Sequence, residues 1–150
     1  MVENETEKKR KNCADALAVI QYKLRQIKKD SSAYGYRYLS LPELVDRVYE
    51  ISGTLGVCIT FDMEKLEGDL YKTTARMVYI ETGESISSSV YGMISSNDIP
   101  VKKDGVTKTM NFMQWFGSCS TYMRRYALQN LLGLAADEDD DAGGKYNNNF

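Results

Sequence analysis

Two stretches near the start of the chain place their apolar residues at the spacing of an α-helix. Between residues 5 and 29, apolar side chains recur every three or four positions, with lysines and Arg25 on the opposite side. This pattern predicts an amphipathic helix. The next stretch begins with Ser40, Pro42 and Glu43, the signature of a capping box with a proline in the first turn. We therefore expect a second helix over residues 41–55 that stops at Gly56.

Residues 57–95 change to the alternation of apolar and polar residues that is typical of β-strands. Residues 57–62 predict one strand, and residues 70–81 and 84–95 predict a hairpin turning at Thr82 and Gly83. That register places Arg76 opposite Ser89 and Thr74 opposite Tyr91. One face of the hairpin then carries polar and cationic residues: Lys72, Thr74, Arg76, Ser87, Ser89 and Tyr91. The other carries residues that can pack on helices: Ala75, Met77, Tyr79, Ile86, Val90 and Ile94.

The rest of the chain reads as a polar loop, a closing helix and an acidic end. Residues 95–109 contain Pro100 and three lysines and are expected to form a loop. The closing helix should begin between Asn111 and Ser118 and end at Gly133. The predicted fold class is therefore α+β, with two N-terminal helices and an antiparallel three-stranded sheet packed on helices. Residues 1–136 are expected to form one domain, and residues 137–150 a disordered acidic tail.

The closing helix supports a functional interpretation better than any other segment. A helical projection gives it an apolar side: Phe116, Met123, Ala127, Leu131 and Leu134. It also gives a polar side: Ser118, Tyr122, Arg125 and Gln129. Arg124 falls within the apolar side, so its guanidinium must meet a buried carboxylate, extend to the edge of that side, or face a polyanion.

Composition narrows the chemistry that the chain can perform. It has no histidine, no Walker-type or GxGxxG glycine pattern, and three cysteines without metal-ligand spacing. These absences argue against the common acid–base, zinc and nucleotide-hydrolysing sites. The net charge of −2 combines a body, residues 1–136, of 18 basic and 16 acidic side chains with five consecutive acids at 137–141. The acidic run leaves a magnesium-dependent nuclease open as an alternative.

The cysteines and the distribution of apolar residues bear on the compartment. Cys13, Cys58 and Cys119 are far apart in apolar surroundings, which favours small core residues in a reducing environment over a disulfide framework. The chain has no apolar run of the length that a membrane span needs and no secretory signal at its start. We expect a soluble, cytoplasmic protein.

Aromatic and cationic residues occur together in three places. They are residues 34–38, the polar face of the predicted hairpin, and residues 122–126 of the closing helix. Single strands of nucleic acid are bound without sequence preference by cationic grooves and by aromatic faces that stack on any base. The pattern therefore favours single-strand binding, with a module for a host protein as a further alternative. Tyr79 and Tyr126 are expected to be core residues instead.

The ordered pattern in these segments resembles a known family. Its elements are Tyr36-Arg37-Tyr38, Gln114, Gly117-Ser118, Thr121-Tyr122, Arg124-Arg125-Tyr126-Ala127-Leu128, and Leu132-Gly133 followed by acids. Over most of the chain, residues 12–141, it resembles the ERF (essential recombination function) family of phage single-strand annealing proteins. The resemblance implies a β-β-β-α core with added helices, similar to that of the eukaryotic ring-forming annealing proteins. It also implies an ATP-independent, non-catalytic recombinase without a cofactor.

The partners that the resemblance implies are single-stranded DNA and further copies of the chain in a ring or helical oligomer. A single-strand-binding protein is a candidate for a third partner. We expect phosphate contacts from Arg124, Arg125, Lys72 and Arg76, with secondary contacts from Lys102, Lys103 and Lys108. The aromatic entry would be Tyr36, Arg37 and Tyr38.

Small residues of the closing helix complete the expected DNA site. Ser118 and Thr121 would let a DNA backbone come close, and a helix start near Ser118 would offer free N–H groups to a phosphate. Close packing against the sheet is the alternative role of these small residues. Contact with a neighbouring subunit is the alternative role of Arg124.

Overall fold

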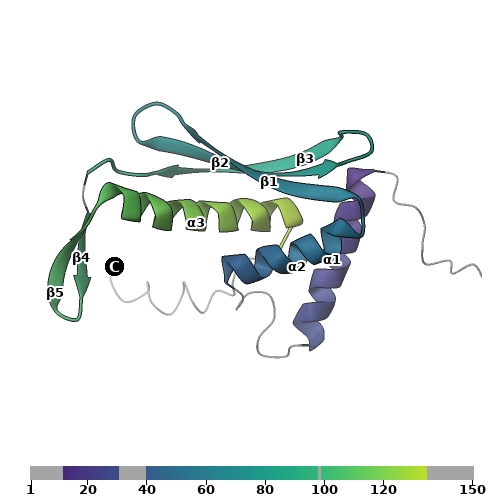
Figure 1. Ribbon diagram of the computed structural model, residues 1–150, viewed down its shortest axis with the longest axis horizontal. Coiled ribbons are helices and arrows are strands. Elements are labelled where there is room, and N and C mark those ends of the chain that lie inside the picture. Colours follow the sequence, from purple (N-terminus) through teal and green to yellow (C-terminus); the bar gives the residue numbers. More distant parts are fainter. Residues whose placement is uncertain (1–11, 31–39, 98, 135–150) are drawn as a thin grey trace, which may run out of the picture. The chain divides into compact units, whose positions relative to one another are not determined.

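Three helices and two antiparallel sheets make up the described part of the chain. The computed structural model describes residues 12–30, 40–97 and 99–134. The helices are α1 (Cys13–Asp30), α2 (Leu41–Gly53) and α3 (Phe112–Leu132). The strands are β1 (Val57–Lys65), β2 (Leu70–Tyr79), β3 (Ser85–Met93), β4 (Ile99–Lys103) and β5 (Val106–Met110) (Figure 1). The first three strands form one sheet in the order β1-β2-β3, and β4 and β5 form a second. The predicted α+β class with an antiparallel three-stranded sheet is confirmed.

The chain divides into two compact units that share the three-stranded sheet. The first unit contains α1, α2 and the sheet residues 57–59, 77–79 and 85–86. Its helices contact one another, and the apolar side of α1 is buried through Ala16, Ile20 and Leu24. The thiol of Cys13 donates to the carbonyl oxygen of Met77 at 3.5 Å, which ties the start of α1 to β2. Burial raises the pKa of this thiol above its ordinary value.

Helix α2 begins with the predicted capping box. The Ser40 hydroxyl accepts the N–H of Glu43, and the Glu43 carboxylate accepts the N–H of Ser40 at 2.7 Å. The hydrogen bond from the Ser40 backbone holds the pKa of Glu43 below its ordinary value. The helix ends at Gly53 rather than at residue 55. Thr54 stops it there, because its N–H and its hydroxyl both donate to the carbonyl of Ile51.

The strands of the main sheet alternate between a buried and an exposed face, as predicted. Along β2 every second side chain is buried, from Tyr71 to Tyr79. The intervening residues, which include Lys72, Thr74 and Arg76, lie on the opposite face and are half-exposed. The first strand is longer than predicted: its alternation continues to Glu64 and the strand itself to Lys65.

The register predicted for the β2–β3 hairpin is wrong by two residues. The N–H of Tyr79 donates to the carbonyl of Glu84, and the hydroxyls of Thr74 and Ser89 lie 2.8 Å apart. Thr74 therefore lies opposite Ser89, not Tyr91. The strands end earlier than the pattern suggests, and the turn takes four residues, 80–83, instead of two. A shift of two residues keeps every side chain on its face, so the predicted polar and apolar faces are correct.

The second unit is built around α3, which packs on the buried face of the sheet (Figure 1). Tyr71, Ile94 and Met123 form a buried cluster that joins β2, the end of β3 and α3. The ring of Phe116 meets that of Tyr71 edge to face, with centroids 5.4 Å apart. Further side chains on the cluster are Met63, Val90, Phe112, Trp115 and Cys119. These contacts fix which side of α3 faces the sheet.

Residues 95–109, predicted as a loop, contain the β4–β5 hairpin. Its register runs from Ile99 opposite Met110 to Lys103 opposite Val106. The turn consists of Asp104 and Gly105, whose φ angles of 54° and 75° are both positive. Two positive φ angles are what a two-residue hairpin turn of the Asp-Gly type needs. The prediction was wrong because it weighed Pro100 and the lysines and overlooked this turn signal.

Thr73 provides a test of the packing of the buried face. Its side chain is 1% exposed, and its hydroxyl has no hydrogen-bond partner among the described residues. Replacing it by valine removes an unsatisfied polar group without a large change in size. Thr73→Val should therefore raise the free energy of unfolding by about 1 kcal/mol in urea titrations.

Ser52→Ala is the matched control. Ser52 is also buried, but its hydroxyl donates to the carbonyl of Val48 at 2.6 Å. Removing this satisfied hydroxyl should cost about 1 kcal/mol. A Thr73→Val protein no more stable than the parent would mean that the Thr73 hydroxyl has a partner.

Candidate nucleic-acid interface

Helix α3 begins well before its small polar residues. Asn111 caps it: the Asn111 side chain accepts the N–H of Gln114 at 3.0 Å, and the Gln114 side chain accepts the N–H of Asn111. The helix ends at Gly133, whose φ of 64° makes a left-handed cap, as predicted. Ser118 therefore lies inside the helix, and the prediction of free N–H groups there is wrong, because the residues before it already form helical turns.

The exposed side of α3 gathers four of the predicted DNA-binding residues. Ser118, Thr121 and Arg124 are exposed, and Arg125 is half-buried and engaged in an interaction within the chain. Helical spacing aligns Thr121 with Arg124, and Ser118 with Arg125. The structure thus brings both arginines and both small hydroxyl residues to one surface, which we call the α3 outer face.

The placement of Arg124 on the apolar side is wrong. In its first turns α3 is buried through residues on the side of Ser120 and Met123. Leu128 and Leu131 flank Arg124 on a helical projection and are buried. They lie in the last turns of α3, where the buried side of the helix is wider. Arg124 precedes this widening and is therefore exposed. For the same reason Gln129, expected on the polar side, is buried.

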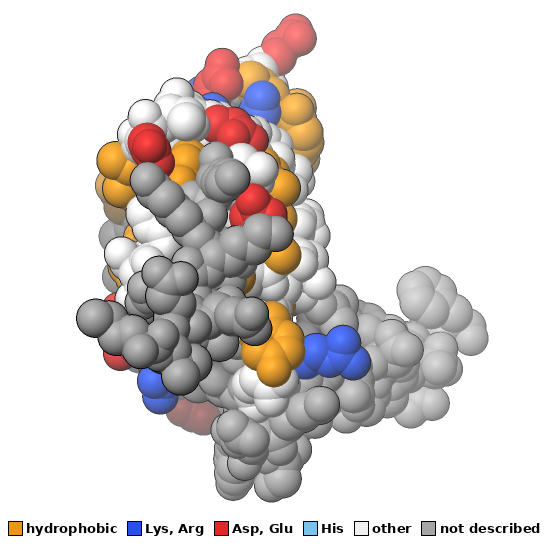
Figure 2. Space-filling view, turned by 90° about the vertical axis from the view of Figure 1, so that its right-hand side faces the viewer, with side chains coloured by type: hydrophobic (Ala, Val, Ile, Leu, Met, Phe, Trp, Pro, Cys, Tyr) orange, Lys and Arg blue, Asp and Glu red, His pale blue; other side chains and the backbone are white. Residues whose placement is uncertain are grey.

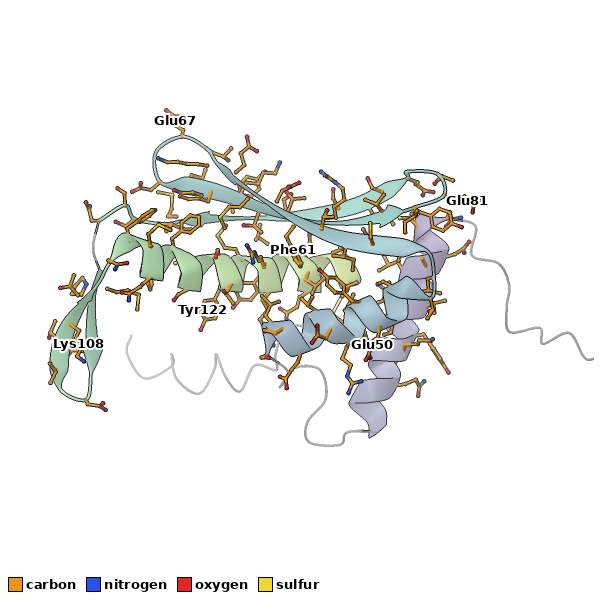
Figure 3. The ribbon with its side chains drawn as sticks, viewed as in Figure 1. Glu50, Phe61, Glu67, Glu81, Lys108 and Tyr122 are labelled. Atoms are coloured by element: carbon orange, nitrogen blue, oxygen red, sulfur yellow. The ribbon has the colours of Figure 1, made fainter. Side chains whose placement is uncertain are left out.

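Two tyrosines complete the α3 outer face. Tyr122 is 63% exposed and Tyr126 is 55% exposed. Tyr122 points away from the sheet (Figure 3). The expectation that Tyr126 is a core residue is therefore wrong, whereas Tyr79 is buried as expected. Tyr122 and Arg125 are three residues apart and are therefore neighbours on the helix surface. An exposed aromatic ring beside an arginine is the combination that stacks on bases while holding phosphates.

Gly117 lies on the same face, and no other described residue packs against it. A Cβ built on Gly117 meets no atom within 4 Å, so close packing against the sheet does not explain the residue. Its carbonyl accepts the hydroxyls of Ser120 and Thr121, each at 3.0 Å. Glycine inside a helix costs about 1 kcal/mol relative to alanine. The sequence shows that small residues occur together here. It does not distinguish packing within the chain from the close approach of a bound molecule.

The cations of the sheet lie elsewhere. Lys72 and Arg76 are on the face of β2 that points away from α3. Arg76 forms an ion pair with Asp62 of β1 at 3.5 Å, with the Arg76 side chain half-exposed and that of Asp62 largely in solvent. Glu64 lies on the same face of β1. This face therefore mixes both charges, and the structure does not bring Lys72 and Arg76 together with Arg124 and Arg125.

The remaining predicted residues fall in two places. Lys102 and Lys108 are exposed on the β4–β5 hairpin (Figure 3). Lys103 belongs to β4, but its side chain is outside the described part of the chain. Tyr36, Arg37 and Tyr38 lie outside the described residues, as does the acidic run at 137–141. The structure therefore does not bear on the aromatic entry or on the alternative magnesium site.

Acidic and basic side chains of the described residues are mixed on the side of the molecule shown in Figure 2, with apolar side chains interspersed among them. This fits the near balance of charge in residues 1–136. A nucleic-acid site in this chain therefore has to be a local one rather than a continuous cationic surface.

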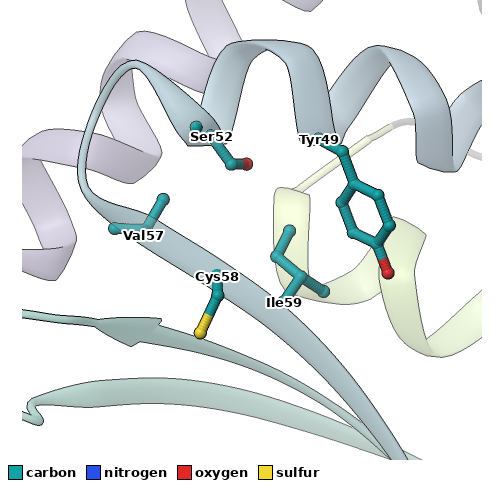
Figure 4. Close-up of a pocket in the computed structure, with 6 residues that line it drawn as sticks. Tyr49, Ser52, Val57, Cys58 and Ile59 are labelled. Atoms are coloured by element: carbon teal, nitrogen blue, oxygen red, sulfur yellow. The ribbon is translucent and has the colours of Figure 1, made fainter.

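One cavity of about 240 Å³ lies in the first unit (Figure 4). It is lined by Tyr49, Ser52, Gly53, Val57, Cys58 and Ile59. The hydroxyl of Ser52 is already donated to a helix carbonyl, so the lining offers little polar chemistry. Cys58 is exposed rather than in the core, contrary to expectation, and all three cysteines are free.

Two further findings concern metals and membranes. No group of three or more His, Cys, Asp or Glu side chains in the described residues could hold a metal ion. None of the helices within those residues has the length and apolar character that crossing a lipid bilayer requires.

Comparisons with known proteins address the identity of the chain. Searches of curated proteins and of solved structures find no match. A family profile described as "ERF superfamily" matches residues 13–150, which include the whole α3 outer face and every helix and strand of the structure. Because this match covers nearly the whole sequence, the chain belongs to the ERF superfamily, a family associated with phage recombination of the strand-annealing type.

Proposed function

We propose that this protein is an ATP-independent single-strand annealing recombinase that acts in phage recombination and repair in the host cytoplasm. It binds single-stranded DNA without sequence preference and promotes pairing of complementary strands, with no covalent step. The observation that carries the proposal is the α3 outer face. On it Arg125 lies one helical turn from the exposed ring of Tyr122, and Arg124 and Tyr126 are exposed as well. Family membership supports the same class of activity.

Annealing requires two physical functions that this face can supply. The repulsion between two phosphate backbones must be screened, which is the role of the arginines. Bases must be held apart from their own strand yet remain exposed, which an aromatic ring does by stacking on one side of a base. Because ring stacking and phosphate contacts do not read sequence, such a face accepts any strand.

Gly117 supports a close approach of the bound strand. It is aligned with Thr121 and Arg124 along α3, and open space lies above its Cα. A backbone that comes this near the helix gains contacts that any larger side chain would block. We therefore assign Gly117 to the binding face although it carries no charge.

Oligomerisation compensates for the modest charge of one subunit. Residues 1–136 carry an excess of two positive charges, which is small for a nucleic-acid-binding domain. Several copies bound to one strand raise the overall affinity without any new contact. A ring or helical array of subunits is therefore part of the proposal, and a single-strand-binding protein remains a candidate further partner.

The direct test is annealing in the absence of ATP and of metal ions. Complementary labelled oligonucleotides should pair faster with the purified protein than without it, in buffer containing EDTA. Full-length oligonucleotides should be recovered afterwards, because no bond is cleaved. Failure to accelerate pairing would refute the proposal, and metal-dependent cleavage would instead favour a nuclease.

Substitution of the arginines tests the binding face. Arg124→Ala and Arg125→Ala should each weaken binding of a labelled oligothymidine about tenfold in fluorescence anisotropy, equivalent to ~1.4 kcal/mol. Each lost phosphate contact should also reduce the slope of log affinity against log salt by about 0.7.

Arg47→Ala is the control for these substitutions. Arg47 is an exposed arginine of α2 in the first unit, pairs with Glu50 at 3.3 Å, and does not belong to the α3 outer face. Its replacement should leave binding unchanged. A variant of Arg124 or Arg125 that dissociates the oligomer while the subunit stays folded would assign that arginine to the subunit interface instead.

Gly117→Ala separates function from stability. The substitution should raise the free energy of unfolding by about 1 kcal/mol, because alanine is favoured in helices and nothing obstructs its methyl group. The same variant should bind single-stranded DNA more weakly. Gly53→Ala, which also meets no atom, is the control and should leave DNA binding at the parental level. Parental affinity in Gly117→Ala would remove Gly117 from the binding face.

A further inference from the structure

The described side chains of the β4–β5 hairpin lie in solvent on both of its faces. Apart from half-buried Met110, all of its described side chains are exposed, and Val106 is 56% exposed. A two-stranded hairpin with both faces in water is only marginally stable. The hairpin nevertheless has an Asp-Gly turn and is paired from Ile99 to Met110, which points to a partner that covers it in the functional assembly.

The composition of the hairpin favours a protein partner over DNA. Its sequence, IPVKKDGVTKTM, contains no aromatic residue to stack on bases. Valine and threonine recur along β5, and these are residues that pair well with another strand. Lys102 and Lys108 are exposed and have no ion-pair partner among the described residues, so the partner should be acidic.

A matching surface exists on the same chain. Strand β1 is an edge of the three-stranded sheet, so one row of its backbone N–H and C=O groups is unpaired within that sheet. Three acids, Asp62, Glu64 and Glu67, and one cation, Lys65, are exposed along this edge and the turn that follows it, so the edge has a net negative charge. The other edge strand, β3, has no charged residue between Ser85 and Met93. Charge complementarity therefore selects β1.

We propose that the β4–β5 hairpin of one copy docks along the β1 edge of a second copy and extends its sheet. The strand that pairs is β5, because β4 contains Pro100, which has no N–H to donate. Lys108 then lies against Glu64, since Asp62 is already paired with Arg76. Both surfaces are present on every copy, so the contact can repeat.

The geometry of this contact determines the kind of assembly. The hairpin and the β1 edge are different surfaces, so the interface is head-to-tail rather than two-fold. Such an interface closes into a ring or continues as a helical filament. The inference rests on the proposed function, because it names the contact through which the annealing oligomer assembles. It also assigns Lys102 and Lys108 to self-assembly rather than to DNA.

A charge-reversal experiment without DNA tests the interface. Lys108→Glu and Glu64→Lys should each lower the average particle mass at least about twofold in light scattering, because like charges opposite each other across strands are destabilising. An equimolar mixture of the two variants should recover the parental mass, since each hairpin then meets an edge of opposite charge. The double variant in one chain should recover it as well.

Lys23→Glu, the same reversal at an exposed position of α1, is the control and should keep the parental mass. Circular dichroism would establish that all variants are folded. The proposal is overturned if the parent is a single subunit, if the single variants keep the parental mass, or if the mixture fails to recover it. It is also overturned if Lys108→Glu weakens DNA binding with no change in mass, which would make the hairpin a DNA contact.

Separate readouts distinguish this inference from the proposed function. Particle mass is measured without DNA, and affinity for oligothymidine is measured by anisotropy. A parent that assembles as described but ignores single strands would refute the proposed function alone. A parent that binds and anneals strands while the single variants keep its mass would refute the interface alone.

Discussion

The packing of α3 on the buried face of the sheet is the constraint on which the second unit depends. Tyr71 comes from β2, Ile94 follows the end of β3 and Met123 comes from α3, and the three side chains form one buried cluster. Once this side of α3 is committed to the sheet, the other side must remain in solvent. Arg124, Tyr122 and Tyr126 on the α3 outer face are therefore exposed and Arg125 is half-buried, while Met123 and Ala127 between them are buried.

The same packing separates the cations of the chain into two groups. Because α3 covers one face of the sheet, Lys72 and Arg76 on the other face are on the far side of the layer from Arg124 and Arg125. The sheet face also carries Asp62 and Glu64, which reduce its attraction for phosphate. A single cationic groove made from both groups is therefore not available within the second unit, and the α3 outer face is the stronger candidate for holding DNA.

The two edge strands of the sheet determine where a second copy can pair in the proposed assembly. A three-stranded open sheet leaves two strands with unpaired backbone groups, and native proteins usually cover or charge such edges. Here β1 is charged and β3 is not. In the proposed docking, the oppositely charged β4–β5 hairpin of another copy pairs with the β1 edge, so this edge is used for a specific contact and is not left open to aggregation. Self-assembly and strand binding would then use different surfaces and need not compete.

Local patterns determined much of this protein from sequence alone: the cap at Ser40, the alternation along β2, the left-handed stop at Gly133 and the family pattern around Arg124 and Arg125. Each depends on residues a few positions apart. Tertiary structure decided the rest. It shortened β2 and lengthened the turn that follows. It also exposed Arg124 and Tyr126 and buried Gln129, because the buried side of α3 changes along its length with the residues that pack on it. A projection of one helix averages over that change, and only the neighbouring strands resolve it.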